Sequence, residues 1–242
     1  MLFPGQPAGL HPDEITIADL LKDQGYATFH VGKWHCGDQP PFLPTRHGFD
    51  RYYGLPYSND MGVQARRPDA PPLPLMENER PIELQPDQRS LTYRYVEQSV
   101  RFIRENAEAD TPFFLYLAHM HVHLPHYPPL AFERRSLNGP YGGAVECIDW
   151  SVSVIVHELR QLGLEENTLV VFTSDNGSRG DRGGSNRPLR GRKGQCWEGG
   201  MRLPCIAWWP GTIPAGTECG QVATSMDFLP TFAWYAGADV PQ

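Results

Sequence analysis

The chain has 242 residues, of which 40% are hydrophobic and 20% are charged, so it carries enough apolar side chains to build a packed core. Lys and Arg number 21 against 28 Asp and Glu, a formal net charge of −7. That balance excludes a general nucleic-acid binder, since such proteins are basic overall. The longest apolar runs are far shorter than the roughly 20 residues that a membrane-spanning helix needs. The sequence therefore predicts a folded chain with no membrane span and no nucleic-acid partner.

The five cysteines are scattered, and none belongs to a Cys-x-x-Cys pair. This pattern indicates neither a zinc ribbon nor a disulfide scaffold, and an odd count leaves at least one thiol unpaired in the monomer. The first residues show neither the basic nor the apolar region of a signal peptide.

Short apolar strands alternate with helical patterns, which is typical of an α/β domain whose sheet is mostly parallel and flanked by helices. Thr16 and Gly25 are suited to begin and end the first predicted helix. In chain order, the predicted helices span residues 16–23, 91–108, 145–162 and 225–236. The predicted strands span residues 26–31, 113–118, 169–173 and 205–209.

Two stretches interrupt this alternation. Residues 55–89 contain seven prolines and predict a surface excursion, with a small hairpin that turns at Asn78-Glu79. Residues 176–200 are rich in Gly and Arg and predict a long loop after the third strand. Loops of that length in a compact domain are usually functional or disordered.

Polar residues gather directly after three of the predicted strands. Lys33 and His35 follow the first strand, His119, His121 and His123 follow the second, and Asp175-Asn176 follows the third. In open parallel sheets the ligand crevice lies outside the carboxyl ends of the strands. The three clusters are therefore expected to converge on one site.

Asp175 and Asn176 offer a carboxylate and an amide oxygen, which are hard ligands suited to Ca²⁺ or Mg²⁺. The plain alternative is an Asn-Gly turn that closes a strand. Asn176 also begins a formal glycosylation sequon, and glycosylation and metal coordination exclude each other there.

His119, His121 and His123 alternate along the chain, so an extended backbone would place them on one face. Zinc is one interpretation of such a series. The other is that one or two of these residues cap the strand end while another binds an anion.

The loop from Arg179 to Arg202 is strongly basic. It holds seven Lys or Arg against two acidic residues, a local charge of +5 in an acidic chain. Such a field favours a small anion such as sulfate or phosphate. A solvated basic loop is the plain alternative, and Trp197 is the only aromatic residue available to stack on a nucleic-acid base.

These residues resemble the sulfatase family. Residues 25–35, GYATFHVGKWH, match the family's second signature along its whole length. Three further blocks follow in the family's order: HVHLP at 121–125, TSDNG at 173–177, and LRGRKG at 189–194 leading to WEGG at 197–200. The resemblance extends from about residue 11 to the end of the chain.

The resemblance implies calcium-dependent hydrolysis of sulfate esters on an alkaline-phosphatase-like fold. The family's nucleophile is a formylglycine made from the Cys or Ser of a Cys-x-Pro-Ser-Arg motif; its hydrated form attacks sulfur and later eliminates sulfate. By position, Asp175 and Asn176 would be metal ligands, for Ca²⁺ or Mg²⁺. Lys33 and Lys193 would hold sulfate oxygens and neutralise transition-state charge.

Two histidines complete the implied site. His35 would assist the formylglycine hydroxyl, and His123 would stand near the leaving oxygen and bind substrate there, as a general acid. His121 is the less favoured candidate for the residue near the leaving oxygen.

The chain also departs from the family's pattern. None of its cysteines lies in a Cys-x-Pro-Ser-Arg motif, the early paired-aspartate strand is missing, and Cys36 stands where the family usually has leucine. We therefore expect residues 1–242 to form a partial catalytic domain that lacks the first strand and the C-terminal subdomain. Such a chain would not turn over sulfate esters alone, would bind metal weakly, and would expose a sheet edge.

Two other functions remain open at this stage. One is a phosphonate or phosphate monoester hydrolase of the same superfamily, and the other is a non-catalytic remnant that binds anions. The implied substrate is a small-molecule or glycan sulfate ester, and the family implies a periplasmic, secreted or lysosomal location. Oligomeric state is not indicated.

Overall fold

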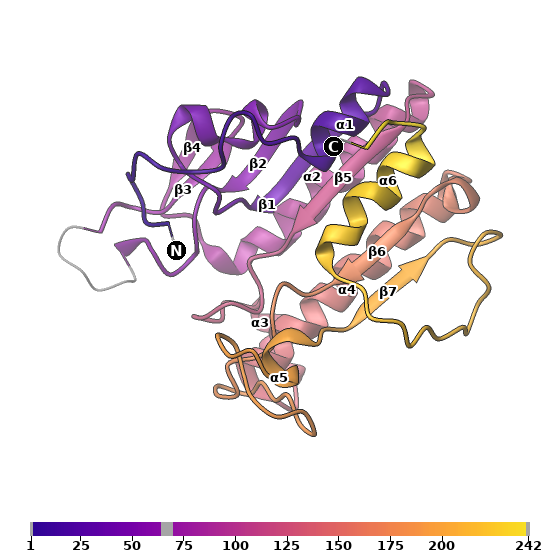
Figure 1. Ribbon diagram of the computed structural model, residues 1–242. Helices are drawn as coiled ribbons and strands as arrows, with labels where there is room; N and C mark the ends of the chain where they lie inside the picture. Colours follow the sequence, from indigo (N-terminus) through magenta and orange to yellow (C-terminus); the bar gives the residue numbers. More distant parts are fainter. Residues whose placement is uncertain (1, 64–69, 241–242) are drawn as a thin grey trace. The chain divides into compact units, whose positions relative to one another are not determined.

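The computed structural model describes residues 2–63 and 70–240 (Figure 1). The chain divides into two compact units. Unit 1 comprises Met1–Pro125 and Gln221–Gln242, and unit 2 comprises His126–Gly220. None of the helices in the described ranges is both long and apolar enough to cross a membrane.

Unit 1 is built on a five-stranded sheet in the order β4-β3-β2-β1-β5 (Figure 1). β1 pairs in parallel with β2 on one side and with β5 on the other, while β2–β3 and β3–β4 are antiparallel. The strands are β1 Ala27–Lys33, β2 Arg51–Leu55, β3 Pro74–Glu77, β4 Arg80–Leu84 and β5 Phe113–Ala118.

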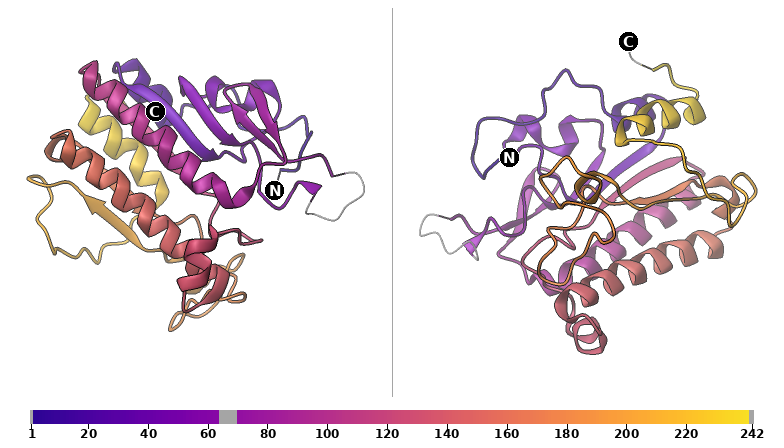
Figure 2. Two further views of the ribbon diagram at one scale, coloured as in Figure 1. Left: turned by 180° about the vertical axis from the view of Figure 1, so that it is seen from behind. Right: turned by 60° about the horizontal axis from the view of Figure 1, so that its bottom comes forward.

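Helices cover both faces of this sheet. α2 (Leu91–Glu108) lies on one face, and α1 (Ile17–Asp23) and α6 (Phe228–Ala236) lie on the other, as the front and rear views show (Figures 1 and 2). Short 3-10 helices complete the described chain in both units, at Pro40–Phe42, Pro44–Arg46, Gln88–Ser90, Glu165–Asn167 and Ser225–Asp227.

Consecutive side chains of β5 contact opposite layers. The Phe113 ring lies 6.0 Å from that of Phe102 in α2, and the Phe114 ring lies 6.5 Å from that of Phe232 in α6. This follows from the two-residue period of a strand. The predicted strand 113–118 is confirmed and pairs in parallel with β1, but it is half-buried rather than buried, with Tyr116 50% exposed, because it is the last strand of the described sheet.

The predicted beginning of α1 is confirmed. The Thr16 hydroxyl accepts from the Asp19 amide at 3.1 Å, and the Asp19 carboxylate accepts from the Thr16 amide at 2.9 Å, which is a capping box. Gly25 follows the helix with φ of +84°, a conformation that favours glycine.

Two glycines let the parallel strands approach closely. A Cβ on Gly54 in β2 would lie 1.8 Å from the Gly32 carbonyl oxygen. A Cβ on Gly32 in β1 would lie 1.9 Å from the Ala118 carbonyl oxygen, and its φ is +114°. Any side chain at these positions would push the strands apart next to their carboxyl ends.

His30, in the middle of β1, is completely buried among aromatic rings. Trp34, Phe49, Tyr52 and Tyr116 present their rings to it at centroid distances of 5.2–5.4 Å, close to edge-on. Desolvation of the imidazole lowers its pKa to about 3. His30 is thus a neutral core residue.

Unit 2 contains the long helix α4 (Gly139–Gln161), the shorter α3 (Leu130–Arg135) and α5 (Glu198–Met201), and an antiparallel pair of strands, β6 (Val170–Thr173) and β7 (Cys205–Trp208). α3 packs against the beginning of α4. Its backbone at Glu133 lies 3.0 Å from where a Cβ of Gly143 would be. Small residues therefore allow this close helix contact.

The predicted α/β class, with a sheet flanked by helices, is confirmed, and four of its details need correction. The predicted hairpin that turns at Asn78-Glu79 is confirmed as β3–β4, but it is part of the main sheet rather than of a surface excursion, so this sheet is mixed. β3 joins β2, and Leu73 and Leu75 are fully buried. The part of that predicted excursion at residues 64–69 lies outside the described residues.

β6 is not a buried parallel strand as predicted: it pairs antiparallel with β7 and is half-buried to exposed. α4 begins six residues before the predicted Val145. Its expected apolar stripe is partly exposed, because α3 covers the side that carries Gly143, Ala144 and Cys147.

Candidate active site

Lys33 is the last residue of β1, and His35 lies two residues beyond it. The backbone leaves the strand alongside the residues after β2, since the amides of Trp34 and His35 donate to the carbonyls of Leu55 and Pro56 at 2.9 and 3.1 Å. His35 has φ of +59°, in the left-handed region that residues other than glycine rarely adopt.

The His35 ring is held and tuned by its neighbours. Its Nε2 lies 3.1 Å from the Leu2 carbonyl oxygen, which only accepts, so Nε2 donates. The pKa of His35 is lowered, mainly by desolvation and further by the charge of Lys33. The Leu2 carbonyl and the Asp60 carboxylate act in the opposite direction.

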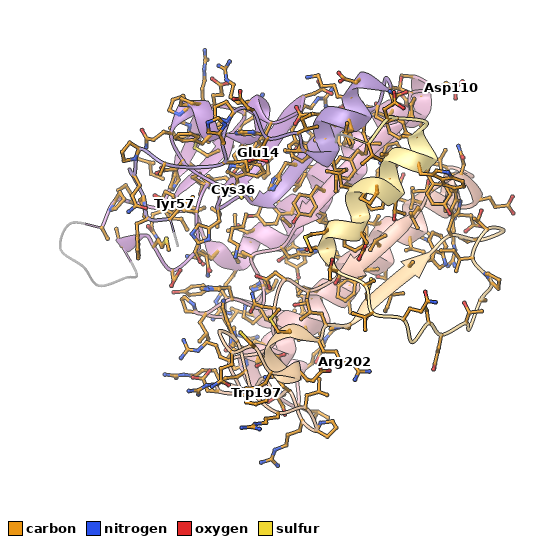
Figure 3. All side chains as sticks on the ribbon, viewed as in Figure 1. Glu14, Cys36, Tyr57, Asp110, Trp197 and Arg202 are labelled. Carbon is orange, nitrogen blue, oxygen red and sulfur yellow. The ribbon has the colours of Figure 1, made fainter. Side chains whose placement is uncertain are left out.

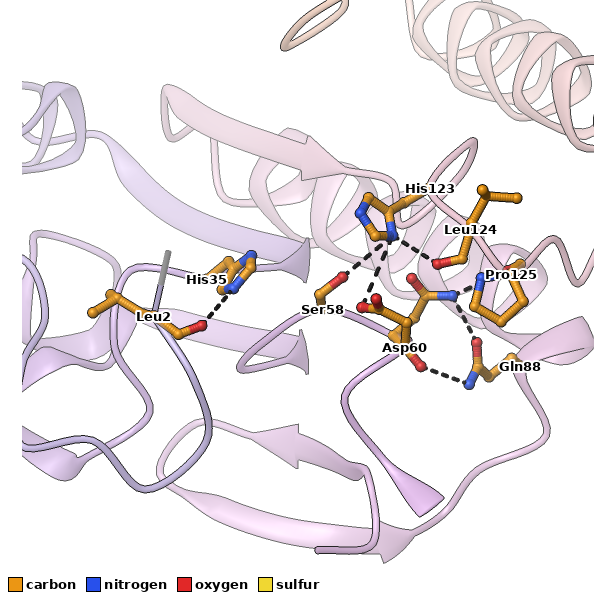
Figure 4. Close-up of polar contacts among 9 residues, drawn as sticks. Leu2, His35, Ser58, Asp60, Gln88, His123, Leu124 and Pro125 are labelled. Carbon is orange, nitrogen blue, oxygen red and sulfur yellow. Dashed lines mark hydrogen bonds and ion pairs between the residues drawn. The ribbon is translucent and has the colours of Figure 1, made fainter. Parts of the chain in front are cut away.

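His123 lies in the segment after β5, where Nδ1 faces three acceptors (Figure 4). Nδ1 is 2.7 Å from the Leu124 carbonyl oxygen, 3.3 Å from the Ser58 Oγ and 4.0 Å from the Asp60 Oδ1. Because a carbonyl can only accept, Nδ1 carries a proton. In the neutral ring, Nε2 is therefore the basic nitrogen.

Sequence reasoning missed Ser58 and Asp60. They follow β2, so they lie at the same strand edge as the residues after β1 and β5. Asn59 anchors them: its Nδ2 donates to the Gln88 Oε1 at 3.0 Å, and the Gln88 Nε2 donates back to the Asn59 carbonyl at 3.1 Å (Figure 4). Recognising Arg51–Leu55 as a strand would have revealed this fourth cluster.

The histidine series does not form one extended face, which corrects the prediction from alternation. The chain turns directly after Met120, where the His123 amide donates to the Met120 carbonyl at 3.1 Å. His121 is buried, and desolvation lowers the pKa of His119 to about 4. Within residues 2–63 and 70–240, no group of three or more His, Cys, Asp or Glu side chains is placed to hold a metal.

Asp175 and Asn176 follow β6 in unit 2. Asp175 is exposed and Asn176 is half-buried. The turn is fixed by its backbone: the Gly177 amide donates to the Gly200 carbonyl at 3.0 Å, and a Cβ on Gly177 would lie 1.9 Å from the Gly199 oxygen. Asp175 and Asn176 therefore lie in a bend whose following residue, Gly177, is hydrogen-bonded to α5.

Lys193 belongs to the same loop system. Its amide donates to the Ser178 carbonyl at 3.0 Å. The Asn186 side chain joins the two sides of this loop. Its Nδ2 donates to the carbonyls of Ser178 and Gly191, and its Oδ1 accepts from the Ser178 amide at 2.8 Å. Fourteen residues of loop lie between Ser178 and Lys193, yet a hydrogen bond joins their backbones.

The predicted site residues thus form two groups. Lys33, His35 and His123 lie at the edge of unit 1 where β1, β2 and β5 end. Asp175, Asn176 and Lys193 lie within one hydrogen-bonded loop system of unit 2.

A sequence model described as Sulfatase matches residues 3–238 of the chain. The chain belongs to the sulfatase family. It is 39% identical to human arylsulfatase A over 262 aligned residues, which cover 100% of this chain and 51% of that protein. It is 41% identical to the N-acetylgalactosamine-6-sulfatase of Canis lupus familiaris over 245 residues, which cover 97% of this chain and 47% of that protein.

A solved structure agrees with this membership. The sulfatase chain resembles the crystal structure of Ps i-CgsB in complex with k-i-k-neocarrahexaose, with a TM-score of 0.87 and 32% identity, over 98% of this chain and 56% of that one. The chain spans about half the length of the sulfatases that it matches. The predicted family and fold are confirmed, while the role of each site residue remains a proposal.

Proposed function

We propose that the full-length protein hydrolyses sulfate monoesters, of a small molecule or a glycan, with a calcium ion. The observation that carries the proposal is the edge of unit 1 where three strands end. Lys33 and two histidines gather there, and one carboxylate, Asp60, acts on both rings. A cation beside two imidazoles is suited to an anionic ester whose leaving oxygen must be protonated.

Lys33 and Lys193 supply the positive charge in this proposal. Negative charge on the sulfuryl oxygens and the leaving oxygen must be balanced during ester cleavage, and fixed ammonium groups do so without reorganisation. Lys33 is fixed by the last position of β1, and Lys193 by the hydrogen bond of its amide to the Ser178 carbonyl.

His123 acts as the general acid for the leaving oxygen. Since Nδ1 donates to the Leu124 carbonyl, the ring can deliver a proton from Nε2 only when it is an imidazolium. The carboxylate of Asp60, 4.0 Å from Nδ1, favours that charged form. His35, whose Nε2 is occupied by the Leu2 carbonyl, is assigned to the nucleophile side, as in the family pattern.

Asp175 and Asn176 are the ligands for the cation. Their carboxylate and amide oxygens fit Ca²⁺, with Mg²⁺ as the alternative, and the backbone of their turn is rigid. When bound, the ion would supply Lewis-acid charge stabilisation. Ca²⁺ takes about 6–8 oxygen ligands, so two side chains alone predict weak affinity in this chain.

The family's formylglycine would supply the covalent chemistry of the whole enzyme, and its Cys-x-Pro-Ser-Arg motif does not occur in these 242 residues. We therefore expect no turnover by this chain alone. Coding DNA that carries the motif in frame ahead of residue 1 would identify the full-length enzyme for the next experiment.

That experiment measures hydrolysis of matched aryl sulfate and aryl phosphate esters by the full-length gene product after formylglycine maturation. We expect sulfate to be preferred, chelation to reduce the rate, and Lys33→Ala, His123→Ala and Lys193→Ala each to lower kcat/KM by on the order of 100-fold. The matched control is Lys22→Ala, because Lys22 lies on α1 and its removal breaks only an exposed ion pair with Asp50.

Two results would contradict the proposal. A preference for the phosphate ester would favour the phosphomonoesterase alternative. Full activity of the His123→Ala variant would remove the general acid from the mechanism.

A further inference from the structure

The basic loop of unit 2 forms an open cavity of about 280 Å³. That volume is close to the lower end of the range for small-molecule sites. Three arginines line it, together with polar side chains between them. These lining residues are Arg179, Arg187, Arg192, Ser185, Asn186 and Gln195.

The walls of this cavity, which we call the arginine cavity, are held in place by hydrogen bonds and close contacts. Asn186 joins its two sides through Ser178 and Gly191. The Gln195 Oε1 accepts from the Arg192 amide at 3.1 Å. Where the loop enters α5, the Arg190 guanidinium lies 3.6 Å from the ring centroid of Trp197. Figure 3 labels Trp197 at the start of this helix. The arginine cavity is thus a built feature of the loop.

The local carboxylates leave most of the positive charge of this loop uncompensated. Asp181 pairs with Arg179 at 3.0 Å, and Glu198 pairs with Arg202 at 3.8 Å. These are the two acidic residues between positions 179 and 202. Within the described part of unit 2, neither Arg187 nor Arg192 forms an ion pair, and both are exposed at the cavity. A guanidinium in this setting binds sulfate or carboxylate through two parallel hydrogen bonds.

The arginine cavity adjoins Lys193. Arg192 and Gln195, which line it, flank Lys193 in the sequence, and the Lys193 amide is bonded to the residue before Arg179. A substrate whose reacting sulfate is held by Lys193 therefore has the cavity beside it.

We propose that the arginine cavity is a second anion subsite, which binds another sulfate or carboxylate of the substrate through Arg187 and Arg192. The inference rests on the proposed function and narrows it. The natural substrate then carries at least two anionic groups, and an ester with one negative charge would leave this subsite unused.

The test is a binding titration of the 242-residue chain with two defined probes, a disulfated disaccharide and its monosulfated counterpart, by calorimetry at low and at physiological salt. We expect the wild-type chain to bind the disulfated probe about tenfold more tightly. The double variant Arg187→Gln/Arg192→Gln should lose that advantage, and Arg187→Lys/Arg192→Lys should restore part of it.

Arg160→Gln is the control for the loss of a positive charge outside the basic loop. Arg160 lies in the last turn of α4. The basic loop contacts the opposite end of this helix, where Asn138, the residue before the first turn, donates to the Gly183 carbonyl. About 20 helical residues, roughly 30 Å, separate the control from the loop. The control should bind the disulfated probe like the wild type.

Three outcomes overturn the inference. The first is that the wild-type chain binds the two probes equally, or binds neither. The second is that the double variant binds the disulfated probe as tightly as the wild type, and the third is that the control loses as much affinity for this probe as the double variant does. None of them decides whether the full-length protein hydrolyses a sulfate ester, because that is measured separately by turnover of an aryl sulfate.

Discussion

The two units position their site residues by different physical means. In unit 1, Lys33, His123 and Asp60 follow strands of a sheet with a helix layer on each face, and the core beneath them contains fully buried aromatic and aliphatic side chains. In unit 2, Asp175 and Lys193 depend on a loop joined by Asn186 and by close glycine contacts. A sheet on a hydrophobic core carries the first group, which hydrogen bonds of Asn59 and His123 then orient, whereas the second group depends on the loop's own hydrogen bonds and glycine contacts.

The largest difference in stability between the two units should appear when one apolar side chain is truncated in each of them. Phe102 is 2% exposed and contacts Phe29 and Phe113, so Phe102→Ala should lower the free energy of unfolding by about 4 kcal/mol. Ile206 in β7 is 61% exposed, and Ile206→Ala should cost less than about 0.5 kcal/mol. Urea unfolding of both variants measures this, and equal losses would contradict the comparison.

The next largest loss of stability should come from a side chain placed between β1 and β2, where the two strands approach closely. Gly54→Ala places a methyl group 1.8 Å from the Gly32 carbonyl oxygen, and the loss should be about 3 kcal/mol, because neither backbone can move without breaking the sheet. Gly220→Ala is the control, since nothing lies within 4 Å of its added Cβ. A melting temperature of Gly54→Ala close to that of the control would show that the strands can separate.

Acid should destabilise unit 1 through His30. Its pKa of about 3 in the folded chain lies below the unfolded value of 6.5, so the unfolded state takes up a proton first as the pH falls. The contribution of neutral His30 to the free energy of unfolding is therefore complete above about pH 6.5 and is lost progressively toward pH 3. Between pH 7.5 and pH 5 the loss from this residue is about 2 kcal/mol.

Replacing His30 with Phe tests this, because Phe keeps an aromatic ring in the cage and cannot be protonated. The variant should lose about 2 kcal/mol less stability than the wild type between those two pH values in urea titrations. Parallel pH dependence of both proteins would assign the acid sensitivity to other groups.

The smallest global effect should come from the loop of unit 2. Asn186→Ala removes the bridge between Ser178 and Gly191 but little buried area, so we expect a loss below about 1 kcal/mol. Hydrogen exchange should nevertheless become faster at the Ser178 and Lys193 amides and stay unchanged in β1. Unchanged exchange in the loop would show that the glycine contacts alone hold it.

Local signals in the sequence determined the elements whose causes are local. The capping box of Thr16, the helical period of residues 91–108 and the glycine at 237 after α6 depend on neighbouring residues, and each appears where it was predicted. The family blocks also pointed to Lys33, Lys193, Asp175 and Asn176 as candidate site residues. They could not show the contacts around these residues.

Only the tertiary structure decided which strands pair and which polar groups meet. An apolar run such as Val170–Thr173 is compatible with either direction of pairing, and its antiparallel partner β7 lies more than thirty residues away. The placement of Asp60 beside His123 depends on β2, whose sequence Arg51–Leu55 is too short and too irregular to stand out. The local propensities were visible in the sequence, but long-range pairing follows from burial and backbone hydrogen bonding of the whole sheet.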